Sequence, residues 1–247
     1  MRVSILSKWY NEIELAPFFF KHYDFADEII IYLDKGSNDG SKEFIENTSK
    51  GRISWGTSGG KLNDGICVRD LNRIAGECKS DWLICVDADE FVFPQGFADP
   101  RHSLEVSDGN VIYAAMWNMY KHADDLPLDP TNPSIMQRRH GDPDRTNPSS
   151  INCTKPIIIK PEIQINWGVG CHEYFPNKKA IVSHTSWDGA HWQSVELDLA
   201  VKRRIKGVRE RISDTNRRNN WAFHNFNVTK EEIETLMEEH KYDPLIF

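Results

Sequence analysis

Three aspartates stand where predicted strands end, and their spacing suits the binding of a cation or of a phosphate-bearing ligand. Asp34 follows the apolar run 29–33, while Asp87 and Asp89 follow the apolar run 82–86. Residues i and i+2 of a strand point to the same face, so we expect the carboxylates of Asp87 and Asp89 to converge. Carboxylate oxygens suit Mg²⁺ or Mn²⁺, and such metals often bridge protein carboxylates to substrate phosphates. The alternative is that residues 87–90 form a solvated turn.

These carboxylates need a rigid frame, and the first ninety residues predict alternating strands and helices. Three short apolar runs are typical of buried strands: 3–6, 29–33 and 82–86. Three segments fit helices: 12–23, with Pro17 suited to its first turn, 41–47 and 64–78. Apolar runs without alternation that are separated by helices indicate a parallel sheet covered on both faces. We therefore predict a doubly wound α/β domain, in which ligands bind at the carboxyl ends of the strands.

Composition narrows the class of protein. The chain has 247 residues, of which 39% are hydrophobic and 27% charged, which argues against an integral membrane protein and against global disorder. With 30 Lys and Arg against 37 Asp and Glu, the net charge of −7 makes nucleic acid a poor candidate partner. We find no apolar segment of signal-peptide length and no run of the ~18 residues that a membrane span needs. The expected location is therefore the cytoplasm.

The five cysteines show no metal-binding or disulfide pattern. They are Cys67, Cys78, Cys85, Cys153 and Cys171, and they form neither a Cys-x-x-Cys pair nor a zinc spacing with histidine. Their odd number and scattered positions do not indicate a disulfide framework. We expect buried or inert thiols, since free cysteines are usually buried.

Several segments occur in an order that resembles the family 2 glycosyltransferases, the inverting enzymes with a GT-A fold. They are Asn11-Glu12, 15–19 with His22-Tyr23, 26–32, 34–41 and 81–91. Each pattern alone is common, but the ordered set is far more specific. The likeness is close over residues 1 to about 93, and a looser match runs from Lys155 to about Arg204. It implies a Rossmann-like, doubly wound and mostly parallel sheet that carries a DxD motif, here Asp87-Ala88-Asp89.

The resemblance also implies a nucleoside-diphosphate-sugar donor, with a UDP-sugar preferred over a GDP- or dTDP-sugar. The residues that it assigns to donor binding are Asn11, Glu12, Asp34, Asp64, Arg69 and Asp87. Glu12 and Asp34 would face the base and the ribose, whose N–H and O–H groups donate to carboxylates. Asp87 and Asp89 would hold Mn²⁺ or Mg²⁺, which neutralises the leaving diphosphate as a Lewis acid. The alternatives are a first-turn helix residue for Glu12, a turn residue for Asp34, and a solvated helix face for Asp64 and Arg69.

Inversion needs a carboxylate that deprotonates the attacking hydroxyl on the face opposite the leaving group. Many relatives use an Asp of a Glu-Asp pair, and this chain has no such pair after residue 94. We predict Glu173 as the base, with Asp124, Asp125 and Asp188 as alternatives. A carboxylate paired with a nearby Lys or Arg is the structural alternative for Glu173.

Histidines and tryptophans gather in the second half of the chain. They are His172, His184, His191, Trp167, Trp187 and Trp192. Some GT-A enzymes complete the metal site with a late histidine, and imidazole suits Mn²⁺, so we predict His184 as a further metal ligand. We predict that His172 and Trp192 contact the acceptor or the diphosphate. Structural histidines and core tryptophans are the alternatives.

The carboxyl-terminal part is expected to be helical. Residues 195–212 combine apolar residues at helical spacing with many Lys and Arg, so this helix could bind the diphosphate, a lipid-linked acceptor or an anionic membrane surface, or form a solvated face. A capping-box pattern at 229–232 predicts a helix over 230–240. Residues 127–150 read as an insertion or a lid over the acceptor. We place the glycosyltransferase domain at 1–193, with a donor half (1–93) and an acceptor half (94–193), and a helical extension at 194–247.

The predicted function is metal-dependent, inverting transfer of a sugar from a nucleoside-diphosphate sugar to a hydroxyl of a glycan or lipid-linked acceptor. A catalytically degenerate nucleotide-sugar-binding protein of the same fold is the alternative, because the Glu-Asp pair is missing. A nucleotidyltransferase is a third option, but residues 7–12 lack the glycines that its phosphate-binding loop usually has.

Overall fold

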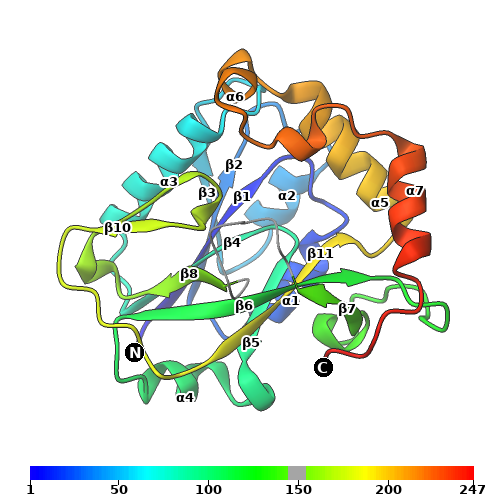
Figure 1. Ribbon diagram of the computed structural model, residues 1–247. Helices are drawn as coiled ribbons and strands as arrows, with labels where there is room; N and C mark the ends of the chain where they lie inside the picture. The colour runs from blue at the N-terminus through cyan, green and yellow to red at the C-terminus, as the bar shows by residue number, and fades with distance from the viewer. Residues whose placement is uncertain (144–153) are drawn as a thin grey trace.

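The structure is a computed structural model that describes residues 1–143 and 154–247. The strands are β1 (Val3–Trp9), β2 (Glu28–Leu33), β3 (Gly51–Trp55), β4 (Trp82–Asp87), β5 (Glu90–Pro94), β6 (Val111–Tyr120), β7 (His140–Pro143), β8 (Thr154–Ile159), β9 (Ile165–Trp167), β10 (Tyr174–Pro176) and β11 (Trp187–Ser194). The α-helices are α1 (Ala16–His22), α2 (Ser41–Glu46), α3 (Asp64–Glu77), α4 (Pro100–Glu105), α5 (Leu197–Val201), α6 (Asp214–Asn219) and α7 (Lys230–Glu239). Figure 1 shows their arrangement.

One large sheet has the strand order β3-β2-β1-β4-β8-β6-β11-β5, with β7 paired to β6, and β9 and β10 form a separate pair. β3, β2, β1 and β4 are parallel to one another. β8 then runs antiparallel to both β4 and β6, and β11 is parallel to β6 but antiparallel to β5. The predicted α/β class is confirmed, and the fully parallel part of the sheet belongs to the first half of the chain.

Helices cover both faces of the central parallel strands β2, β1 and β4, most of whose residues are buried. Ile5, Ile29 and Ile84 pack on the α1 side, while Leu6 and Leu83 pack against α3. Even positions of β1 and odd positions of β4 therefore face α3, as strand alternation requires. This places Lys8 and Asp87, at the ends of those strands, on the α3 side of the sheet.

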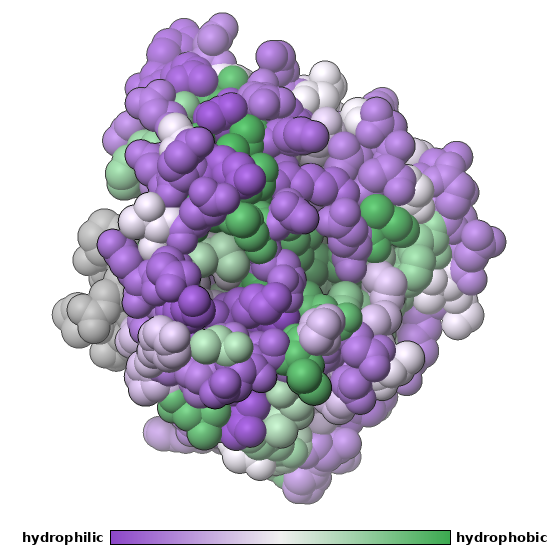
Figure 2. Space-filling view, turned by 90° about the vertical axis from the view of Figure 1, so that its right-hand side faces the viewer, coloured by the Kyte–Doolittle hydropathy of each residue, from purple (hydrophilic) through white to green (hydrophobic). Residues whose placement is uncertain are grey.

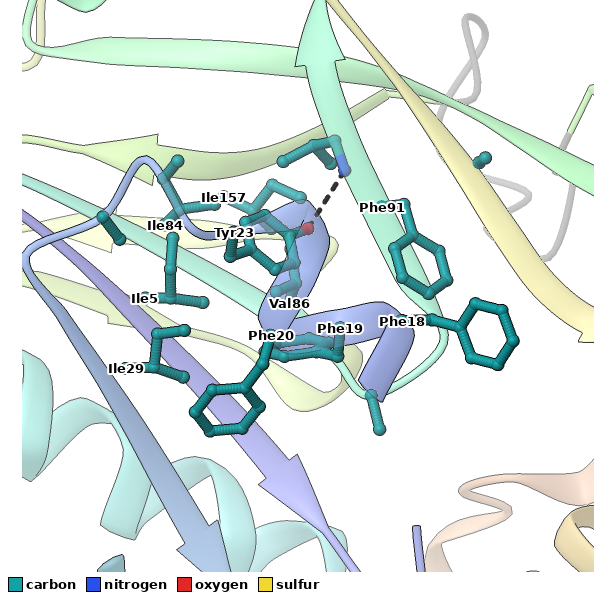
Figure 3. Packing of buried hydrophobic residues seen from close by; sticks show 14 of the residues in the cluster. Ile5, Phe18, Phe19, Phe20, Tyr23, Ile29, Ile84, Val86, Phe91 and Ile157 are labelled. Atoms are coloured by element: carbon teal, nitrogen blue, oxygen red, sulfur yellow. Dashed lines mark hydrogen bonds between the residues drawn. The ribbon is translucent and has the colours of Figure 1, made fainter. Parts of the chain in front are cut away.

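The core on the α1 side is aromatic (Figure 3). Phe19 lies 4.7 Å from Tyr23 between ring centres and 5.3 Å from Trp9. The Tyr23 hydroxyl donates to the carbonyl oxygen of Glu90 at 2.7 Å and accepts from the Val92 N–H at 3.0 Å. This hydroxyl fixes the start of β5 against α1, and with it the turn that carries Asp89.

Most helices expected in the first half and at the carboxyl end are present. α2 and α3 match the predicted ranges, α1 begins at Ala16 with Pro17 in its first turn, and α7 has the predicted capping box between Thr229 and Glu232. The helix expected over 195–212 is interrupted: α5 is followed by a π-helix, η5 (Lys202–Val208), and a 3₁₀ turn, η6 (Arg209–Arg211). In Figure 1 the segments from α5 to α7 gather at one side of the molecule.

The surface is largely polar. No helix within residues 1–143 and 154–247 is long and apolar enough to cross a membrane. Figure 2 shows one face on which hydrophilic residues predominate and hydrophobic residues show mainly in a recessed central strip. Part of the predicted insertion, and Cys153, lie outside the described residues.

The imidazole of His22 predicts a specific pH dependence of stability. Its Nε2 lies 3.0 Å from the carbonyl oxygen of Val92, to which the neutral ring can donate. Burial lowers the pKa of His22 from 6.5 to about 4. In the unfolded chain His22 becomes protonated near pH 6.5, whereas in the folded chain it stays neutral down to about pH 4. The free energy of unfolding therefore falls as the pH falls from 6.5 to 4. At about 1.4 kcal/mol per pKa unit, the loss approaches about 3 kcal/mol.

Urea unfolding of the protein and of His22→Gln at several pH values between 7 and 4 checks this expectation. The glutamine amide can still donate to Val92 but does not titrate, so the variant should lose less stability on acidification. An equal decline in both proteins would contradict the assignment.

Candidate functional site

The strand order places a topological switch point between β1 and β4. The chain moves outward from β1 through β2 to β3 and returns through α3 to β4, on the other side of β1. Such a switch point at the carboxyl ends of parallel strands is where open α/β sheets bind ligands. A small cavity, partly open to solvent, lies there. It is lined by Lys8, Asp64, Cys67, Val68, Leu71, Cys85, Val86, Asp87, Glu90, Gly170 and Cys171.

Lys8 stands between two of the predicted donor-binding carboxylates. It is in register with Asp87, and its Nζ lies 3.6 Å from Asp87 Oδ1 and 3.9 Å from Asp64 Oδ1. The charge of Asp87 raises the pKa of Lys8 well above its usual value. Burial opposes ionisation of Asp87, but Lys8 and then Lys155 hold the pKa of Asp87 below its usual value. This end of the cavity therefore holds the Lys8 ammonium between the carboxylates of Asp87 and Asp64.

A second charged group lies at the β4–β5 turn and is more deeply buried. The Arg203 guanidinium donates through Nε to Glu12 Oε2 at 2.9 Å, through Nη2 to Glu12 Oε1 at 3.2 Å, and through Nη1 to Asp89 Oδ2. His191 Nε2 lies 3.3 Å from the same Asp89 oxygen. Burial raises the pKa of Glu12 to about 7, even though Arg203 favours its charged form. Burial also opposes ionisation of Asp89, but Arg203 and His191 hold its pKa well below the usual range.

A third group surrounds Asp34 at the end of β2. Asp34 Oδ1 accepts from the Gly36 N–H at 2.7 Å, and its Oδ2 accepts from Ser58 Oγ at 2.8 Å and from Arg211 Nη2 at 2.6 Å. The guanidinium carbon of Arg211 lies 3.2 Å from the centre of the Tyr10 ring. Asp34 is thus buried in a network within the protein, with an arginine stacked on the adjacent aromatic ring.

Two other predicted donor residues have local structural partners. Asn11 has a φ of 56° and its side-chain oxygen accepts from the Asn38 N–H at 2.8 Å, which joins the loops after β1 and β2. The side chain of Arg69 is 65% exposed and donates to the neighbouring Asp70 at 2.9 Å. Arg69 lies on α3, but it is not among the residues that line the cavity.

Asp87 and Asp89 do not converge as strand alternation predicts. β4 ends at Asp87, and Ala88 and Asp89 form a turn before β5, so the two side chains no longer follow one strand. Asp87 faces Lys8, and Asp89 faces Arg203 and His191. They remain close enough for the charge of Asp89 to oppose ionisation of Asp87.

The structure corrects the expectation that His184 is a metal ligand. His184 is 94% exposed and its Nδ1 lies 2.6 Å from Asp108 Oδ2. Asp108 precedes β6, whose first residue, Val111, is aligned through β8 with Leu83 at the start of β4. His184 therefore lies near the end of the sheet where β4 begins, whereas the carboxylates of the site lie where β4 ends.

The structure also corrects the expectation that Trp192 contacts a ligand. Its side chain is fully buried, with ring centres 4.7 Å from Phe91 and 5.6 Å from Phe18. Strand alternation puts Trp192 and Asp188 on the face of β11 opposite His191, which is the residue that reaches Asp89.

Glu173 and His172 lie beside the cavity rather than in its lining. They follow Gly170 and Cys171, which do line it, and the His172 ring lies close against Gly170. Glu173 is exposed. The alternative base Asp125 accepts from the His122 N–H at 2.8 Å, outside the residues that line the cavity. Glu173 as the base therefore stays a prediction.

The cationic side of the site was not predicted. Lys8 was given no role, and the basic residues of 195–212 were expected to bind a diphosphate, a lipid-linked acceptor or a membrane surface, or to form a solvated face. Instead, Arg203 and Arg211 point inward to Glu12, Asp89 and Asp34. A signal was present in the sequence, since buried carboxylates at strand ends need cations, but nothing in it selected these two arginines.

The carboxylates of Asp87 and Asp89 and the imidazole of His191 are ligand types that suit a divalent cation, but their ligand atoms do not all lie within 4.8 Å of one another. Arg203 is also bound to Asp89, so a cation would have to share or take that oxygen. A second group of potential ligands lies elsewhere: Asp142, His240 and Asp243 place three ligand atoms within 4.8 Å of one another.

No protein-family model matches the sequence, and no curated protein matches it either. Among solved structures, the S. aureus TarS 1-349 crystal structure is 14% identical with a TM-score of 0.45, over 83% of this chain and 64% of that one. TarS 1-349 in complex with UDP-GlcNAc is 12% identical with a TM-score of 0.43, over 97% and 71%. Mannosyl-3-phosphoglycerate synthase from Rubrobacter xylanophilus is 16% identical with a TM-score of 0.34, over 52% and 43%. The chain thus spans less than two thirds of the first of these, and similarity at this level assigns neither a substrate nor a reaction.

Proposed function

We propose that the protein is a GT-A glycosyltransferase that transfers a sugar from a nucleoside-diphosphate sugar, with a UDP-sugar as the first candidate donor. The observation that carries the proposal is the cavity at the switch point between β1 and β4, whose mouth holds Lys8, Asp64 and Asp87. The last of the sequence motifs that resemble family 2 glycosyltransferases, 81–91, supplies four residues of the cavity lining: Cys85, Val86, Asp87 and Glu90. The fold alone would not assign a function, because one fold serves many reactions.

The donor is proposed to lie across the carboxyl ends of β2, β1 and β4. The carboxylates of Asp34 and Asp64 can accept from the base and the ribose hydroxyls. The ammonium of Lys8 has three N–H donors, so it can contact a diphosphate oxygen while it stays beside Asp87. A divalent cation, Mn²⁺ or Mg²⁺, would be held by Asp87 and Asp89 and would neutralise the diphosphate as it leaves.

A thermal-shift panel of UDP, GDP, dTDP and CMP, each with Mn²⁺ and with EDTA, tests the donor class. A ligand at 100 times its Kd stabilises a protein by about 2.7 kcal/mol, which is several degrees at this chain length. We expect a shift with UDP that inorganic phosphate does not reproduce. The absence of a shift with every nucleotide, on folded protein, would contradict the proposal.

Inversion is proposed to use Glu173 as the base that takes the proton of the acceptor hydroxyl. Replacing Glu173 by glutamine should then lower the release of UDP from the donor by about 10²-fold or more, while donor affinity stays nearly unchanged, because the base acts only on the acceptor. Glu162→Gln is the matched control, since it makes the same change at an exposed glutamate nearby. An equal loss of turnover and donor affinity would contradict the assignment of Glu173.

A protein that binds the donor without transferring the sugar is a second candidate. It is favoured by the ion pairs of Glu12, Asp34 and Asp89 with arginines of the chain, since carboxylates held in this way can serve a structure as well as a reaction. Tight binding of the donor with no consumption of it, over a range of hydroxyl acceptors, would favour this candidate.

A further inference from the structure

One segment of the chain supplies the cations for both buried acidic groups of the site. This segment, 197–211, comprises α5, η5 and η6, and we call it the strap. Its Arg203 binds Glu12 and Asp89, and its Arg211 binds Asp34. The strap thus holds three residues that belong to three different loops, at the ends of β1, β2 and β4.

We propose that Arg203 and a divalent cation compete for Asp89, so that the cation must displace Arg203 from this carboxylate before it can bind there. The proposal deepens the proposed function and rests on it, because the displacing cation is the one that would accompany the nucleotide donor.

Burial makes this contact more than a surface ion pair. The side chains of Arg203, Glu12 and Asp89 are 15%, 9% and 4% exposed. The contacts use three of the five N–H donors of the guanidinium, in the forked geometry in which arginine binds carboxylates most strongly. Without Arg203, two buried carboxylates would face each other, and their repulsion could be relieved by a proton on Glu12 or by another cation.

Steric and electrostatic reasons disfavour binding of both cations at the same oxygen, Asp89 Oδ2. Divalent metals bind carboxylate oxygens at about 2.0–2.6 Å, inside the space that a hydrogen-bonded guanidinium fills. Asp89 Oδ2 already receives Arg203, with His191 Nε2 at 3.3 Å. A metal ion at this oxygen would repel Arg203, and the released guanidinium would be free to bind phosphate oxygens, for which its fork is equally suited.

A second arginine of the strap, Arg211, also binds a carboxylate of the site. Arg211 is eight positions after Arg203 along the strap, binds Asp34 at 2.6 Å, and donates through Nε to the carbonyl oxygen of Gly60 at 2.8 Å. Its guanidinium lies over the Tyr10 ring, beside the carboxylate that the resemblance assigns to the base and ribose. The strap therefore binds a carboxylate at both the proposed cation end and the proposed nucleoside end of the site.

Titration of Mn²⁺ in the absence of nucleotide, followed by electron paramagnetic resonance, tests the competition. Arg203→Met removes the competing cation, and we expect Mn²⁺ to bind this variant roughly tenfold more tightly than the unchanged protein. Lys206→Met is the matched control: it removes the same charge from an exposed position of the strap and should leave Mn²⁺ affinity unchanged. Arg203→Lys, which keeps a cation, should bind Mn²⁺ less tightly than Arg203→Met.

Each titration is repeated with Asp89→Asn added, because the group of Asp142, His240 and Asp243 can also bind Mn²⁺. Mn²⁺ binding that is lost when Asp89→Asn is added is assigned to Asp89, and only this binding is used to test the competition. Equal affinity of Arg203→Met and the unchanged protein would overturn the proposal, and so would an equal gain in Lys206→Met, which would reveal a general charge effect.

A measurement on the unchanged protein covers the case in which Arg203→Met does not fold. Addition of Mn²⁺ with UDP should speed amide hydrogen exchange in 197–211, and unchanged or slower exchange there would overturn the proposal. Failure of the proposed function would be seen separately: Mn²⁺ competition without any nucleotide binding contradicts the donor assignment, whereas UDP binding with no competition contradicts only the role of Arg203.

Discussion

Replacing Lys155 by methionine is expected to lower the free energy of unfolding by about 3–5 kcal/mol. The Lys155 and Glu90 side chains are 8% and 3% exposed and form an ion pair in the middle of the sheet. Glu90 also accepts from the Asp87 N–H at 3.0 Å, so it must remain where it is to hold the β4–β5 turn. Without Lys155 a buried carboxylate loses its partner, which costs more than the pair itself contributes. Urea unfolding at pH 7 measures the loss.

The double variant Glu90→Gln with Lys155→Met is the control for this prediction. It removes both charges and keeps an amide that can accept from Asp87, so it should recover much of the stability lost in the single variant. A single variant that loses less than about 1 kcal/mol would show that Glu90 is solvated or neutral, contrary to its burial. Because Glu90 lines the cavity, the same variants also report whether the turn is needed for nucleotide binding.

Replacing Trp192 by alanine is expected to lower the free energy of unfolding by about 3–5 kcal/mol, because it empties a large volume at the centre of the aromatic core. The ring is fully buried between Phe91 and Phe18. Its Nε1 is buried and, within residues 1–143 and 154–247, has no acceptor in hydrogen-bond range. Thermal or urea unfolding measures the effect.

Trp192→Phe is the matched variant. It keeps an aromatic ring and removes the N–H, so the smaller volume is partly offset by the loss of a buried donor, and the variant should be much more stable than Trp192→Ala. Both variants, while folded, should bind nucleotide as the unchanged protein does. A Trp192→Ala protein that kept its stability but lost ligand affinity would restore the tryptophan as a ligand contact.

The first half of the fold could be predicted because its strands are continuous apolar runs. Buried parallel strands such as β1, β2 and β4 carry that signature, and α3 shows a clear apolar stripe. Two of the later strands lack it: β11 contains Asp188, Gly189 and His191, and β6 mixes buried and half-buried positions. Their identity depends on pairing with distant strands, which no local pattern encodes.

The candidate site could be predicted only on its acidic side. Asp34 and Asp87 were recognisable because each directly follows an apolar strand. Their cations come from far along the chain: Arg211 is 177 residues from Asp34, and Arg203 is 191 residues from Glu12. The helical pattern of 195–212 placed these arginines on a polar face, and only the packing of the strap turns that face toward the site.

Asp89 and His184 show two other limits of the sequence pattern. The rule that i and i+2 share a face fails for Asp87 and Asp89 because the chain turns after Asp87. The family resemblance proposed His184 as a late metal ligand, and the structure places His191 rather than His184 beside Asp89. The two histidines lie at opposite ends of their part of the sheet, which spacing in a single sequence does not reveal.

Calorimetric titration of UDP into the protein and into two variants of Val68 tests the central claim, that the switch-point cavity binds the nucleotide. Val68 lies on α3 and lines the cavity. Val68→Trp should fill the cavity and abolish UDP binding, while Val68→Ala, which only enlarges it, should bind UDP about as well as the unchanged protein. Equal UDP affinity in all three folded proteins would show that the nucleotide binds elsewhere or that the site has another ligand.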